Sequence, residues 1–153
     1  MQLLQLFESV PRIRTLLGVA EHSTSLDLSA RHGTLGPAGV RLLAAELGAR
    51  RAAAELCALD LSGSPVTGTH VEFFPNGKLK RLEHPDREVR GVESLVLAGG
   101  GRLRSLAVAG CFIGDAGVSA IAEAILSWPP TPKEDKADNE GKPAAVEVPP
   151  LPF

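Results

Sequence analysis

The chain has 153 residues, which suits one domain, and its 16 basic and 18 acidic residues give a formal net charge of -2. This near balance argues against nucleic acid or an anionic membrane as a partner. Aromatic residues make up only 4%, so we expect a core of Leu, Val, Ile and Ala. No stretch approaches the roughly 20 apolar residues of a membrane-spanning helix. The two cysteines form no CxxC pair, and we expect a cytoplasmic protein.

The N-terminal residues 1–25 are expected to form a helical cap. Within them, segment 11–22 carries Ile13, Leu16, Leu17 and Ala20 at helical spacing. We expect a helix there that covers the open end of the following structure.

Three strand-like segments come next, at 26–28, 56–66 and 103–113, and Leu26, Leu59 and Leu106 occupy equivalent positions in them. Because side chains alternate along a strand, the residues that flank these leucines should share the opposite face. On that face we expect Ser25, Asp27 and Ser29 from the first segment, Ala58, Asp60 and Ser62 from the second, and Ser105, Ala107 and Ala109 from the third.

A Gly-Val pair follows each strand-like segment, at 39/40, 91/92 and 117/118. After the first and last pairs the period changes to that of a helix, with apolar stripes at Val40, Leu43 and Leu47 and at Val118, Ile121 and Ile125. For the middle segment, 92–98, a strand is the alternative interpretation to a helix. Only 11 residues separate Leu95 from Leu106, whereas a parallel crossover needs about a dozen or more, so we prefer a helix.

The middle unit contains an insertion, 67–90, between its strand and its helix. Asn76-Gly77 is a hairpin turn sequence, and segments 70–74 and 78–82 are the expected arms. The last 25 residues, 129–153, contain 7 prolines and many charges, so we expect a disordered tail. Its PPLP sequence, 149–152, is a minimal motif for SH3-type domains.

The strand and helix patterns together resemble those of leucine-rich repeats. LCALDLSGSPV and LRSLAVAGCFI are similar to the LxxLxLxx(N/C)xL strand signature, and LGPAGVRLLAAEL and IGDAGVSAIAEAI resemble the helical half of the ribonuclease-inhibitor subclass. The resemblance covers about residues 26–126. It implies an α/β solenoid, a short horseshoe of about three repeats (26–128) with parallel strands on the concave side and helices on the convex side.

The resemblance also implies binding of proteins through the concave strands, without catalysis. Such repeats occur in ribonuclease inhibitors, in sensor domains of innate-immune receptors and in Ran GTPase-activating proteins. The Asn/Cys position bonds backbone groups of the turn in the family. In this chain Cys111 occupies that position in the third unit and Ser64 occupies it in the second. In the first unit Arg31 and His32 stand there, so the position has no clear equivalent.

We therefore interpret the chain as a protein–protein interaction module or scaffold that needs no cofactor or metal and binds neither nucleic acid nor membrane. The partner is another protein, and self-association or stacking with further repeats stays open. A fragment of a larger regulator, of the sensor or GTPase-activating type, is the alternative. The candidate partner-binding residues are Asp27, Asp60, Ser62, Phe73, Phe74, Lys78, Lys80 and Arg81.

An enzyme is the competing class of function. Cys57 with His70 or His84 is the only nucleophile–base pairing to propose, and the histidines show no HExxH spacing. Because Cys57 lies in a strand-like segment, we expect it to be a buried structural cysteine and the chain not to be an enzyme.

Overall fold

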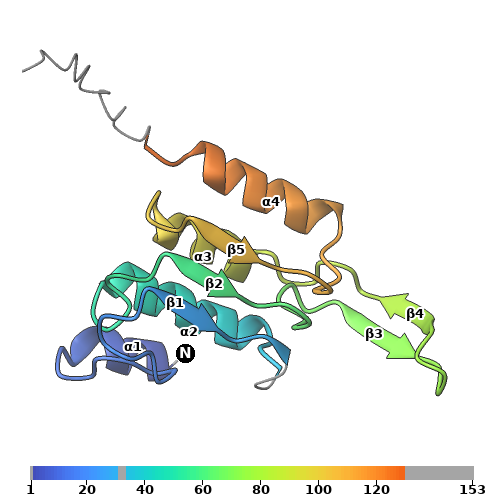
Figure 1. The fold of residues 1–153 in the computed structure, drawn as a ribbon, viewed down its shortest axis with the longest axis horizontal. Coiled ribbons are helices and arrows are strands. Elements are labelled where there is room, and N and C mark those ends of the chain that lie inside the picture. Colours follow the sequence, from blue (N-terminus) through green and yellow to red (C-terminus); the bar gives the residue numbers. More distant parts are fainter. Residues whose placement is uncertain (1, 31–33, 130–153) are drawn as a thin grey trace, which may run out of the picture.

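The computed structural model describes residues 2–30 and 34–129. These residues form a mixed α/β fold with four helices, a parallel three-stranded sheet and a two-stranded hairpin (Figure 1). The tail from residue 130 onward, with its PPLP sequence, lies outside the described residues, as do Arg31 and His32.

The parallel sheet has the strand order β1-β2-β5. Its strands are β1 (Ser25–Asp27), β2 (Ala58–Asp60) and β5 (Ser105–Ala107). Leu26 pairs with Leu59, and Leu59 pairs with Leu106, which confirms the register predicted from the Leu-x-Leu spacing.

A helix follows each of these strands, and the three helices lie together on one side of the sheet (Figure 1). They are α2 (Pro37–Ala49), α3 (Arg90–Gly99) and α4 (Asp115–Leu126). The helix over segment 92–98 is thereby confirmed against the strand alternative. Gly100 ends α3 in the left-handed conformation, where a glycine avoids a Cβ clash. The chain thus contains three strand–helix units: β1–α2, β2–α3 and β5–α4.

The core lies between the sheet and the helices and is aliphatic, as the composition predicts. Its centre consists of Val40, Leu43, Leu47, Leu56, Leu59, Leu61, Val66, Val92 and Leu95. Leu106 packs against this cluster but is only partly buried, because β5 is the outermost strand of the sheet.

Side chains from one unit bind the helix end of the preceding unit. The Arg51 guanidinium donates to three backbone carbonyls in and after the N-terminal helix. Arg102 donates to the carbonyl of Leu47 in α2, and the Trp128 indole N–H donates to the carbonyl of Val96 in α3, at 2.9 Å. Leu47 lies in the last turn of α2, where a helix leaves its carbonyls unpaired, whereas the Val96 carbonyl also accepts the Gly100 N–H.

The predicted helix at 11–22 is wrong, because the N-terminal helix, α1, spans Gln2–Ser9 and segment 11–22 is irregular. Phe7 of α1 is fully buried, and the Arg51 guanidinium lies 4.3 Å from its ring centroid. A short helix and an irregular segment therefore cover the first unit.

The irregular conformation of segment 11–22 has a polar cause. Glu46 of α2 is buried, and its carboxylate accepts the backbone N–H groups of Leu16 and Leu17 and the hydroxyl of Thr15. These N–H groups would be engaged within a helix, so a helix here would leave the Glu46 carboxylate without donors. Gly18, at φ 75°, also interrupts helical geometry.

The insertion forms an antiparallel hairpin that projects beyond the sheet (Figure 1). Its strands, β3 (His70–Phe73) and β4 (Leu79–Glu83), match the predicted arms to within one residue. The turn contains Asn76, whose side-chain oxygen accepts the Lys78 N–H, and Gly77 at φ 77°.

Candidate functional site

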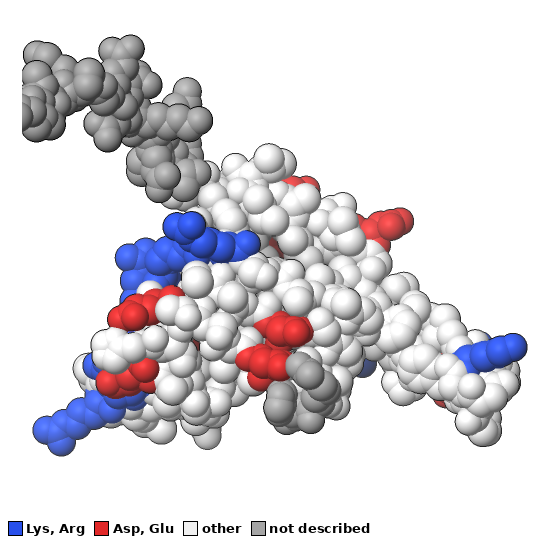
Figure 2. Space-filling view, in the orientation of Figure 1, with Lys and Arg blue, Asp and Glu red and all other residues white. Residues whose placement is uncertain are grey.

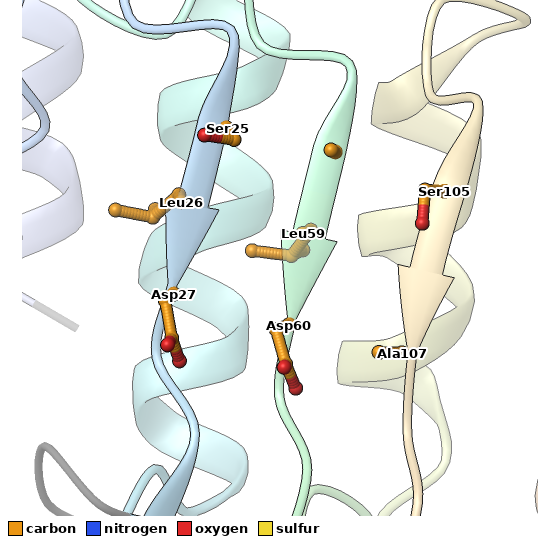
Figure 3. A pocket seen from close by; sticks show the side chains of 8 residues that line it. Ser25, Leu26, Asp27, Leu59, Asp60, Ser105 and Ala107 are labelled. Carbon is orange, nitrogen blue, oxygen red and sulfur yellow. The ribbon is translucent and has the colours of Figure 1, made fainter.

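Two surfaces carry the predicted partner-binding residues: the face of the parallel sheet away from the helices, and the hairpin. The sheet face has a shallow hollow of about 220 Å³. Figure 3 shows Asp27 and Asp60 side by side at the ends of β1 and β2, their carboxylates directed the same way, with Ala107 at the equivalent place in β5. The predicted adjacency of the two aspartates is therefore confirmed.

The two aspartates have a structural role that the sequence interpretation missed. Asp27 Oδ1 accepts the N–H of Ser29 at 2.9 Å, and Asp60 Oδ1 accepts the N–H of Ser62 at 2.8 Å. Each carboxylate thus stabilises the turn at the end of its own strand, as aspartate does in Asx turns. Ser29, expected on the sheet face, is buried instead, because the turn directs it inward.

The hairpin has one apolar and one charged face. Val71 pairs with Leu82, and Phe73 pairs with Leu79 across a bulge. Because side chains alternate along β-strands, these four residues share one face. The other face carries the pair His70–Glu83 and the pair Glu72–Arg81.

The apolar side of the hairpin is open to solvent. The relative exposures are 53% for Phe73, 46% for Phe74, 50% for Leu79 and 41% for Leu82. We call these four residues the hairpin patch. Phe73, Leu79 and Leu82 share the apolar face, and Phe74 is exposed at the end of the same arm. Large exposed apolar side chains gathered on one hairpin are of the kind that marks interaction sites.

The hairpin patch continues onto the third unit through Phe112. The rings of Phe73 and Phe112 meet edge to face, with centroids 5.9 Å apart and an interplanar angle of 63°. The two rings line a hollow of about 230 Å³ together with Pro65, Thr69 and Val71. Sequence reasoning did not single out Phe112. Its position between Cys111 and Ile113 in the repeat pattern indicated only a turn residue.

The predicted basic residues of the hairpin are partly engaged within the hairpin itself. Lys80 pairs with Glu72 at 3.2 Å, and Arg81 pairs with Glu83 at 2.8 Å. The hydrogen bond from Lys80 lowers the pKa of Glu72, which stays ionised. Figure 2 shows basic side chains at the outer end of the hairpin. The charges therefore form a mixed rim around the apolar side chains rather than a basic patch.

The base of the hairpin is fixed by buried polar groups. Thr67 and Thr69 are buried and share a hydrogen bond of 3.1 Å between their hydroxyls, and Thr69 Oγ1 also accepts the Asp86 N–H. The Asp86 carboxylate in turn accepts the N–H groups of Gly114 and Gly117 at the start of α4. This network mounts the hairpin rigidly on the third unit.

The nucleophile–base pairing considered in the sequence is not assembled. Cys57 precedes β2, whereas His70 and His84 lie at the base of the hairpin, which follows the C-terminal end of β2 (Figure 1). Cys57 is also only partly buried, contrary to expectation, and its thiol donates to the Thr24 carbonyl at 3.3 Å.

Within the described ranges, no group of three or more His, Cys, Asp or Glu side chains is arranged to hold a metal ion. None of the helices described is long and apolar enough to cross a membrane. Comparison of the chain with protein-family models, with curated proteins and with solved structures gives no significant match.

Proposed function

We propose that the chain is a leucine-rich-repeat stack of the ribonuclease-inhibitor type that acts as a non-catalytic protein-binding module. The in-register leucines of the three parallel strands support the repeat assignment. So does the Asn/Cys position. The Cys111 thiol donates to the Leu61 carbonyl of the preceding unit at 3.2 Å, and Ser64 Oγ accepts the Leu35 N–H at 3.1 Å.

The observation that carries the binding function is the hairpin patch. Aromatic side chains that insert into a partner's pocket contribute most of the energy of many interfaces. Phe73 and Phe74 are the exposed aromatic residues of the described chain, and they lie on a short, hydrogen-bonded ribbon. Because a rigid ribbon loses little conformational entropy on binding, its contacts contribute fully to affinity.

The partner that fits this patch is a protein with an apolar groove or pocket bordered by polar groups. Lys80 and Arg81, with their paired carboxylates, would lie at the rim, where exposed ion pairs add little affinity but help to orient the partner. Asp27 and Asp60 offer a shallow acidic area that adds selectivity. Both cysteines are free thiols, which suits a function in the reducing cytoplasm.

A two-step experiment tests this function. The full chain is used to capture partners from a cell extract, and the affinity of the strongest captured protein is then measured in purified form. Replacement of Phe73 and Phe74 by Ser should weaken its binding more than about 30-fold. Leu97→Ser, which removes an equally exposed leucine of α3, is the matched control and should leave affinity unchanged.

Circular dichroism separates loss of binding from loss of fold. Both variants should keep the helical signal and melt within a few degrees of the original chain, because the three side chains are about half exposed. Normal binding by the folded double variant would place the interface elsewhere and contradict the proposal.

A further inference from the structure

Phe112 adopts a backbone conformation that its place in the repeat does not require. Its φ is 52°, in the left-handed region that residues with a Cβ seldom adopt. The equivalent residue of the second unit is Pro65, whose ring fixes φ at about −65°. The same turn can therefore be made without a left-handed residue. Such conformations persist where the surroundings hold them, and they gather at ligand-binding sites.

The ring of Phe112 and that of Phe73 enclose a slot between the second unit, the third unit and the hairpin. The two rings stand edge to face with centroids 5.9 Å apart, and Pro65 and Val71 complete the apolar lining. We call this hollow of about 230 Å³ the aromatic slot. A water molecule occupies roughly 30 Å³, so the aromatic slot has room for a pyrrolidine ring.

Proline-rich segments are the ligands that suit such a surface. Their extended polyproline helix is formed before binding, and the domains that recognise it use grooves lined by aromatic side chains. Because a proline-rich segment has few N–H groups and presents carbonyl oxygens, its site must supply hydrogen-bond donors. His70 lines the aromatic slot, is exposed, and carries a ring N–H in either neutral tautomer. The aromatic slot thus combines an aromatic lining with a donor.

We propose that the aromatic slot binds a proline-rich segment, and that in the free protein this segment is the PPLP sequence, 149–152, of the same chain. The proposal rests on the proposed function, because a segment in the slot would cover Phe73 and compete with the protein partner for the hairpin patch. Nearby charges favour the same occupant. Glu147 precedes the PPLP sequence, and Lys78 at the hairpin turn has no carboxylate partner among the residues that the structure describes.

The chain is long enough to bring this segment to the aromatic slot. α4 runs from the base of the hairpin, where Asp86 binds Gly114 and Gly117, to the opposite side of the molecule (Figure 1). Its 12 residues span about 18 Å. Positions 129 and 149 are 20 residues apart, and a peptide coil of that length has a root-mean-square end-to-end distance of roughly 25 Å. A chain length that matches the span gives an effective concentration in the millimolar range, so even a weak site is occupied.

Paramagnetic relaxation in the full chain tests the contact. A nitroxide is attached at Ala145→Cys in a Cys57→Ser background, where the remaining native cysteine, Cys111, is buried. We expect the amide signals of residues 69–73 to lose more than about half of their intensity, because the tethered segment is present at a millimolar effective concentration. The amide signals of α1, at the other end of the molecule, should keep theirs (Figure 1).

Three variants show whether the prolines and the slot cause this loss. Replacement of Pro149, Pro150 and Pro152 by Ser should abolish the loss of intensity. The matched control is Pro143→Ser, which removes a proline outside the PPLP sequence and should leave the loss unchanged. Phe112→Gly tests the slot itself, because glycine adopts φ 52° freely and only the ring is removed. It should also abolish the loss, and circular dichroism verifies that each variant is folded.

Unchanged signals in the original chain overturn the proposal, and so does a loss of intensity that persists when the three prolines are replaced. A mixture of isotope-labelled chain without nitroxide and unlabelled chain with nitroxide separates two sources of the segment. If the mixture loses as much intensity as the chain that carries both labels, the segment belongs to a second copy, and the contact within one molecule is overturned.

Failure of this proposal is distinguishable from failure of the binding function, because the relaxation measurement needs no partner. Once a partner has been captured, the variant without the three prolines should bind it at least about 3-fold more tightly, since the segment no longer occupies part of the hairpin patch. An unchanged affinity in a variant that has lost the contact would overturn the competition with the partner.

Discussion

Asp86, at the base of the hairpin, accepts the backbone N–H of Gly117 in the first turn of α4 at 2.8 Å. The same carboxylate accepts the N–H of Gly114 at 2.9 Å. A residue of the insertion thus caps the helix of another unit, 31 positions further along the chain. A Cβ on Gly117 would lie only 2.8 Å from Asp86 Oδ1, so glycine permits this close approach.

Replacement of Asp86 by Asn should lower the free energy of unfolding by about 1–3 kcal/mol, because the amide accepts fewer hydrogen bonds than the carboxylate and lacks its charge at the N-terminus of α4. Urea titration at pH 7 measures the change. Glu123→Gln removes an exposed carboxylate from the same helix and should cost less than about 0.5 kcal/mol. Equal effects of the two changes would show that the bonds to Gly114 and Gly117 do not stabilise the fold.

The Asp86 bonds also predict a pH dependence. Burial alone would raise the pKa of Asp86, but the N–H groups of Gly117 and Gly114 and the hydroxyl of Thr67 together hold it below its usual value. A carboxyl whose pKa is lower in the folded state stabilises the fold above its unfolded pKa of about 3.9, and this contribution disappears as the pH falls through the folded pKa. The difference in stability between the original chain and Asp86→Asn should therefore shrink between pH 5 and about pH 2.

Glu46 should be among the polar residues most important for stability. Glu46→Ala would leave the N–H groups of Leu16 and Leu17 without their acceptor and would open a cavity beside α2. We expect a loss of about 2–4 kcal/mol in a denaturant titration. Limited proteolysis should then cut within segment 10–18 first. Glu55→Ala, at an exposed glutamate, should leave both measurements nearly unchanged.

Leu59 and Glu46 illustrate which parts of the fold could be predicted from the sequence and which could not. The strand register followed from the spacing of apolar residues, because a slip by one position would turn Leu59 from the core to solvent. The conformation of segment 11–22 depends on a carboxylate about 30 positions away. The apolar residues of this segment do recur at helical spacing. Local spacing, however, carries no information about a long-range hydrogen bond.

The candidate site was predictable to a similar degree. Asn76-Gly77 and the adjoining apolar arms placed Phe73 and Phe74 on a hairpin, and the repeat alignment placed Asp27 beside Asp60. The contact between Phe73 and Phe112 joins two units whose relative position follows from the folded core, so no single segment predicted it. The exposure of Val118 and Ile125 on α4 was equally hidden, because their residue types match those of the buried positions Val40 and Leu47.

The two cysteines should react differently with a thiol reagent. Cys57 is partly accessible, whereas Cys111 is buried and its burial raises the pKa of its thiol. Because the thiolate is the reactive form, Cys111 should react only on unfolding and Cys57 should react in the native protein. Single Ser variants at each position assign the signals. A native Cys111 that reacts as fast as Cys57 would contradict the packing of the third unit.

Trp128 should contribute to stability through its indole N–H. It donates to the Val96 carbonyl of α3 and leaves the outward side of α4 open. Trp128→Phe keeps an aromatic ring but removes the donor and part of the packed ring, so it should cost about 1–3 kcal/mol.

The single tryptophan of the chain allows a second measurement of the same contact. Its fluorescence in the original chain should change in the same transition as the circular dichroism signal, because Trp128 joins the third unit to α3. An earlier fluorescence transition would show that the residues around Trp128 unfold before the core. In that case Trp128→Phe should leave the main transition unchanged, and the bond to Val96 would hold only the end of the described chain.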